Sequence, residues 1–73
     1  MEDFKKNISN TDFNFKYLRE GEDVLFLVNV DAQSFRMITD DEGNWGIWQQ
    51  VPAWIKNLEG ELATAIEENY RGN

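Results

Sequence analysis

The chain lacks cysteine and histidine altogether and holds a single proline among its 73 residues. Without these two residue types it can form neither a Ser-His-Asp triad nor a cysteine nucleophile. The same absences remove the usual ligands of zinc, haem and iron–sulfur centres, and they exclude disulfides. We therefore expect a protein with no enzymatic activity and no cofactor.

Long hydrophobic runs are also missing. The longest, residues 24–28, is far shorter than the ~20 residues that a membrane-spanning helix needs. Residues 1–6 lack the apolar region of a secretion signal. Together with the absence of cysteine, which fits a reducing compartment, these features predict a cytoplasmic protein with no membrane partner.

Positive charge is scarce: 7 Lys and Arg stand against 14 Asp and Glu, giving a net charge of −7. Binding to nucleic acid requires a basic face that displaces counterions from phosphates, so we expect no nucleic-acid partner. The main interpretation of the acidity is solubility. The alternative is an acidic surface that mimics nucleic acid and inhibits a DNA-binding protein.

The length of the chain allows one domain. Residues 1–11 show little pattern beyond Phe4 and Ile8, so they are predicted to form a flexible or loosely docked N-terminal arm. Residues 12–73 are then the single folded domain. A domain of this size buries only about 60% of the surface that its unfolded chain exposes.

Alternating apolar residues predict four β-strands, at residues 12–18, 24–30, 33–39 and 45–49. A two-residue turn at positions 31–32 would place Val28 opposite Phe35 and Leu27 opposite Arg36. Apolar residues then meet on one face of the hairpin. Short connections favour pairing of consecutive strands, which predicts an antiparallel meander.

A helical pattern follows Pro52, a residue well tolerated at the first helical position. Apolar residues recur there at spacings of three and four, which is typical of an amphipathic helix; they are Ile55, Leu58, Leu62, Ala65 and Ile66. The predicted fold is α+β: a four-stranded antiparallel meander with one C-terminal amphipathic helix packed on one face (β-β-β-β-α).

One helix can cover only one face of such a sheet. The other face would carry apolar residues with two cations beside them, and exposed apolar patches with polar rims mark interaction sites. The predicted interaction residues are Trp48, Leu25, Leu27, Ile38, Arg36 and Lys16, with Leu18 as a further candidate. Alternatively, the N-terminal arm covers this face through Phe4 and Ile8.

Two other segments are candidate ligand sites. Trp45, Trp48 and Trp54 lie within ten residues and offer a binding platform for a small ligand. The alternative is that Trp45 and Trp54 fill the core between sheet and helix. Residues 40–44 form an acidic turn, but they lack the spacing of a calcium-binding loop, so we expect no metal there.

The order of a short meander, a segment with Trp48 and Pro52, and a helix is similar to that of the MbtH-like proteins, small acidic partners of peptide synthetases. Trp48 is followed by Gln49 where that family has proline, and the Gly-Trp pair after the proline is absent. No activity, partner or site residue is therefore carried over from the family.

The sequence thus predicts a small non-enzymatic protein-interaction module that uses the helix-free sheet face. Its partner is another protein or a second copy of the chain. Two alternatives stay open, the nucleic-acid mimic and the small-ligand binder. A continuous acidic face without an apolar patch would favour the mimic.

Overall fold

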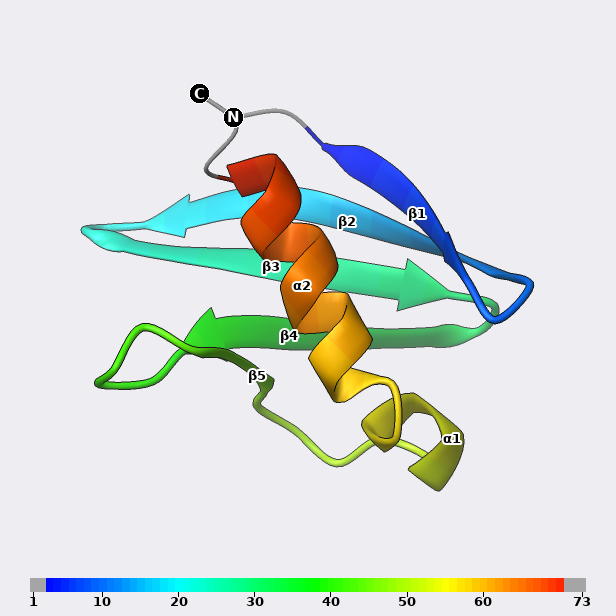
Figure 1. Ribbon diagram of the computed structural model, residues 1–73. Helices are drawn as coiled ribbons and strands as arrows, with labels where there is room; N and C mark the ends of the chain where they lie inside the picture. The colour runs from blue at the N-terminus through cyan, green and yellow to red at the C-terminus, as the bar shows by residue number, and fades with distance from the viewer. Residues whose placement is uncertain (1–2, 71–73) are drawn as a thin grey trace.

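The computed structural model describes residues 3–70 as one antiparallel sheet with two helices. The strands are β1 (Phe4–Ile8), β2 (Thr11–Glu20), β3 (Asp23–Val30), β4 (Gln33–Thr39) and β5 (Trp45–Ile47), followed by α1 (Ala53–Lys56) and α2 (Glu59–Tyr70). Each strand pairs with the next in the sequence, and α2 lies across the strands on one side of the sheet (Figure 1). The predicted α+β meander with a C-terminal helix is confirmed, with five strands instead of four.

The hairpin of β3 and β4 has the predicted register. Val28 lies opposite Phe35 and Leu27 lies opposite Arg36. Asp31 takes the positive φ, 51°, that the two-residue turn requires. Because the register is fixed, Val28 and Phe35 face the core together, whereas Leu27 and Arg36 face the other side.

The additional strand, β1, lies where the sequence predicted an arm. It pairs with β2 along its whole length, ending at Ile8 opposite Thr11. Ser9 and Asn10 form the connecting turn, with φ values of 53° and 61°. Two successive residues with positive φ are the hallmark of the type I′ turn, whose twist matches that of antiparallel strands. Residues 8–11 therefore form the closed end of a regular β-hairpin.

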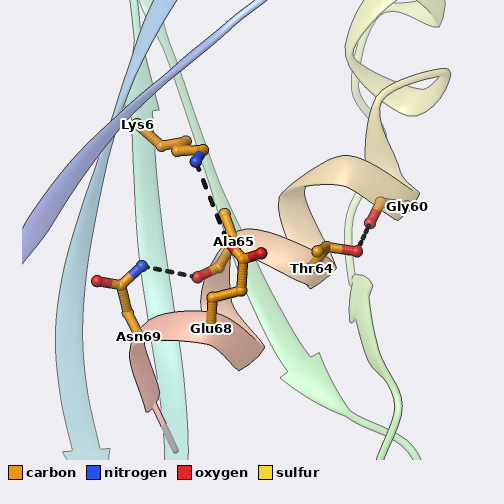
Figure 2. A network of polar contacts seen from close by, with 6 residues as sticks. All are labelled: Lys6, Gly60, Thr64, Ala65, Glu68 and Asn69. Atoms are coloured by element: carbon orange, nitrogen blue, oxygen red, sulfur yellow. Dashed lines mark hydrogen bonds and ion pairs between the residues drawn. The ribbon is translucent and has the colours of Figure 1, made fainter. Parts of the chain in front are cut away.

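β1 directs its apolar side chains toward the side of the sheet that carries α2. Ile8 is buried, and the ring of Phe4 stacks on Phe15 with a centroid distance of 4.5 Å. Lys6 points to the same side, where its ammonium lies 4.0 Å from a carboxylate oxygen of Glu68 on α2 (Figure 2). Phe4 and Ile8 thus do not cover the opposite face, as the alternative interpretation of the arm required.

The core lies between the sheet and the helices, and Phe26 is at its centre. Phe26 is fully buried, and its ring centroid lies within 6.5 Å of five others, those of Phe4, Phe15, Tyr17, Trp45 and Tyr70. The remaining fully buried large side chains are Phe13, Phe15, Val28, Val30, Phe35, Met37, Ile55, Leu62 and Ile66. The predicted facing of the strands and the helix is therefore correct.

The helical segment is interrupted where the sequence predicted one continuous helix. The Leu58 N–H donates to the carbonyl of Ile55 (2.9 Å), a tighter turn than that of an α-helix, and α2 begins at the next residue. Ile55 in α1 and Leu62 in α2 are both fully buried. The helix axis therefore changes direction while the apolar residues stay in contact with the core.

The outward side of α2 is polar and acidic. It carries the exposed side chains of Glu61, Glu67 and Glu68. The side chains of Thr64 and Asn69 donate hydrogen bonds to the carbonyls four residues earlier, at 3.0 and 2.9 Å (Figure 2). Four of the 14 acidic residues of the chain thus lie on α2.

Candidate interaction surface

The six predicted interaction residues lie on the side of the sheet opposite α2. Antiparallel partners share a face, and the register places Lys16 beside Leu27 and Leu27 beside Arg36. Leu25 and Ile38 follow two residues along β3 and β4 and so point the same way. Both helices pack against the other side, through core residues of α1 and α2. We call this surface the helix-free face.

Trp48 is placed on this face by one hydrogen bond beyond the end of β5. Its backbone N–H donates to the carbonyl of Arg36 (3.1 Å), which continues the β4–β5 register by one residue. The indole therefore lies beside Arg36, as strand alternation predicts. Its side chain is 62% exposed, the highest value among the large apolar side chains of residues 3–70.

The apolar residues of the helix-free face differ in accessibility. Leu18, Leu27 and Ile38 are half-buried, whereas Leu25 is only 5% exposed although it lies outside the main core. A depression of about 800 Å³ borders the face, and Leu25, Ile38 and Trp48 are among its lining residues. The face is therefore a shallow apolar surface with one protruding aromatic residue.

Beyond the end of β5, the side chain of Gln49 forms hydrogen bonds with the backbone of β4. Its side-chain oxygen accepts a hydrogen bond from the Arg36 N–H (3.1 Å), and its amide nitrogen donates to the Ser34 carbonyl (3.2 Å). The sequence predicted a strand through this residue, but β5 itself ends at Ile47. The side chain of Gln49 thus replaces the missing backbone contacts and fixes the segment that carries Trp48.

Glu59, the first residue of α2, protects the outer edge of β5. One carboxylate oxygen accepts a hydrogen bond from the Ile47 N–H (2.8 Å), and the other lies 3.0 Å from the Lys56 ammonium. A Cβ atom at Gly46 would lie only 3.3 Å from this carboxylate, so a glycine there permits the close approach. An edge N–H that is already bonded cannot pair with another chain.

These contacts hold the pKa of Glu59 below its usual value of 4.5, first through the Ile47 N–H and then through Lys56. Because the folded pKa is the lower one, folding favours the ionised carboxylate. The resulting stabilisation is complete above about pH 4.5 and is lost as the pH falls through the folded pKa.

We expect Glu59→Gln to reduce stability at pH 7 by about 1 kcal/mol, because the charge-assisted bond and the ion pair are both weakened. The difference in melting temperature from the parent should shrink when the pH falls below 4. Glu61→Gln, in the same helical turn but exposed, is the control. If the melting temperatures of Glu59→Gln and the parent differed as much at pH 3 as at pH 7, the stabilising role of the ionised Glu59 carboxylate would be contradicted.

The three tryptophans lie in different surroundings. Trp45 is buried, with its ring 5.4 Å from Phe26 and 6.0 Å from Tyr70. Trp54 is 43% exposed and lies against Phe13 at 6.4 Å, so it does not fill the core as one interpretation of the sequence expected. No two tryptophan rings pair among the aromatic contacts of residues 3–70.

The acidic turn between β4 and β5 is organised by Asp40. Its carboxylate accepts hydrogen bonds from the backbone N–H groups of Asn44 (3.0 Å) and Glu42 (2.8 Å), which lower the pKa of Asp40. Across residues 3–70, no three acidic side chains come close enough together to hold a metal ion. In the structure, Asp40 therefore serves the geometry of the turn.

Comparisons with protein families, with curated protein sequences and with solved structures found no match to this chain. Within the described part of the chain, neither helix has the length and apolar character needed to cross a bilayer. The geometry of the helix-free face is therefore the basis for a functional proposal.

Proposed function

We propose that the protein is a small non-enzymatic module that binds a protein partner through the helix-free face, and that it acts in the cytoplasm. The observation that carries the proposal is Trp48, whose large apolar side chain is 62% exposed on a face that no described helix covers. Tryptophan and arginine are the residue types most enriched among interface hot spots. Trp48 lies in register with Arg36, so both types occur together.

The backbone around Trp48 supports a role in binding. It is held against β4 by the bond from the Trp48 N–H to the Arg36 carbonyl and by the bonds of the Gln49 side chain to the Arg36 N–H and the Ser34 carbonyl. A rigid and exposed aromatic residue loses little conformational freedom when it binds, which favours affinity. The mixed composition of the face, with cations beside apolar residues, favours this function over mimicry of nucleic acid, which needs a uniformly acidic surface.

We expect Trp48→Ala to abolish capture of the partner from native lysate while changing stability by less than about 1 kcal/mol, because the side chain is mostly exposed. Trp54→Ala is the matched control, since Trp54 is also partly exposed but lies on the side of the core residue Phe13. The measurement is quantitative mass spectrometry of the proteins captured by each variant, alongside its thermal melt.

A protein lost with Trp48→Ala and retained with Trp54→Ala would support the proposed face. Its direct contact with the chain is then checked by titration with the purified partner. Equal capture by both variants and the parent would contradict the proposal.

A further inference from the structure

We propose that the helix-free face binds a second copy of this chain, face to face about a two-fold axis. The inference rests on the proposed function, because it names the partner of the same face. It follows from the order of charged and apolar residues along the strands, which makes the face complementary to itself.

Along β2, three residues of the face follow one another at intervals of two: Lys16, Leu18 and Glu20. Alternate residues in a strand lie about 7 Å apart on the same face. The sequence along the strand is therefore cation, apolar residue, carboxylate. This order places a positive and a negative group on opposite sides of Leu18.

Each neighbouring strand carries part of this order: β3 supplies two apolar residues and a carboxylate, and β4 supplies a cation and an apolar residue. On β3, Leu25 lies beside Leu18, and Asp23 lies beside Glu20. On β4, Arg36 lies two residues before Ile38. The face thus carries three parallel rows across the strands. We call them the apolar row (Leu18, Leu25, Ile38), the cationic row (Lys16 and Arg36, with Leu27 between them) and the acidic row (Glu20, Asp23).

A two-fold axis that runs along the apolar row turns the second copy over and exchanges the two outer rows. The apolar row then packs against itself. The cationic row of each copy lies over the acidic row of the other. Lys16 of one copy then faces Glu20 of the second copy, and Asp23 lies over Leu27, between Lys16 and Arg36 of the second copy. An interface of this kind is isologous: every contact occurs twice.

The charged groups of both outer rows are available for these contacts. All four side chains belong to exposed residues. The ion pairs within residues 3–70 join Lys6 to Glu68 and Lys56 to Glu59, so neither Lys16 nor Arg36 has a carboxylate partner within the described part of the chain.

In this arrangement the charges of the two outer rows balance each other. The two outer rows contribute two cations and two carboxylates, whereas Glu61, Glu67 and Glu68 lie on the helix side. Packed sheets are about 10 Å apart and each helix adds about 10 Å, so the two α2 helices would lie roughly 30 Å from each other. Charges at that distance are screened, because the Debye length is about 8 Å at physiological ionic strength.

The test is a pair of charge reversals. Variant A carries Lys16→Glu and Arg36→Glu, so both of its outer rows are acidic. Variant B carries Glu20→Lys and Asp23→Lys, so both of its outer rows are basic. The mass of the parent and of each variant is measured by sedimentation equilibrium over a concentration series, with far-UV circular dichroism to verify folding.

We expect the parent to sediment at twice its chain mass of 8.6 kDa. Variants A and B alone should be monomers, with self-association weakened about tenfold or more, because like charges then oppose each other. An equimolar mixture of A and B should restore a dimer, since every acidic row then meets a basic one. Glu61→Lys with Glu67→Lys, which changes the net charge as much as variant B, should leave the parent dimer intact.

A monomeric parent, dimers of A or B as stable as the parent dimer, or a mixture that stays monomeric would each overturn the inference. Arg36→Glu and Asp23→Lys as single changes give the same test with less perturbation of the fold. If the parent is monomeric but Trp48→Ala still loses a captured protein, this inference fails and the proposed function stands. If neither effect is found, both fail.

Discussion

Replacing Phe26 with alanine is expected to destabilise the domain by about 3–5 kcal/mol. The ring is fully buried and contacts aromatic side chains from β1, β2, β5 and α2, so its removal leaves a cavity bordered by several elements that cannot all close over it. A domain of 73 residues has a total stability of roughly 4–11 kcal/mol. The variant should therefore be marginally folded or unfolded at room temperature.

Thermal and urea denaturation followed by circular dichroism measure this effect. A loss of this size corresponds to a fall of about 12 °C or more in the melting temperature. Trp48→Ala removes an even larger side chain, but from an exposed position, and should melt within a few degrees of the parent. Similar melting temperatures for Phe26→Ala and the parent would show that the core is not centred on Phe26.

Replacing Leu62 with alanine is expected to cost about 2–5 kcal/mol. Leu62 is fully buried and lies in the first half of α2, which packs with α1 against the core side of the sheet. Its loss weakens the contact between α2 and the sheet without lowering the helix propensity, because alanine is the best helix former. The expected result is a large decrease in the free energy of unfolding from urea titration.

Thr64→Ala is the matched control for this change. Thr64 lies in the same helix, two residues further on, but it is exposed and bonds only to the Gly60 carbonyl. Its replacement should change the stability by less than about 1 kcal/mol. If Leu62→Ala and Thr64→Ala had equal effects, the packing of α2 would contribute little to the fold.

The position of the candidate surface could be predicted from strand alternation. Leu25 and Leu27 must point away from Phe26, because successive residues in a strand face opposite sides. The same rule places Ile47 on the core side of the sheet and Trp48 on the opposite side. What alternation could not indicate is that Leu25 would be nearly inaccessible while Trp48 protrudes. The accessibility of a side chain depends on how the neighbouring strands and their side chains pack around it. The spacing of residues within one strand does not predict that packing.

β1 and Glu59 show where the sequence was insufficient. In β1 the core-facing positions read Phe4, Lys6 and Ile8, so the charged residue in the middle hid the alternation. The Lys6 side chain stays exposed there, with its ammonium 4.0 Å from a carboxylate oxygen of Glu68, which lies 62 residues away in the chain. Likewise, nothing in the sequence distinguishes Glu59 from other acidic residues in the first turn of a helix. Its bond to the Ile47 N–H joins two elements that only the folded chain brings together.

The sequence by itself determined the α+β class, the order of β2 to β5 before a helical segment, the register of the β3–β4 hairpin and the two faces of the sheet, because each depends on periodicity within a short segment. Only the tertiary structure decided that β1 completes the sheet, that the helix divides near Leu58, and that the edge of β5 is closed by Glu59. These features depend on contacts between residues distant in the chain, whose free energies outweigh the weak local preferences of the segments involved.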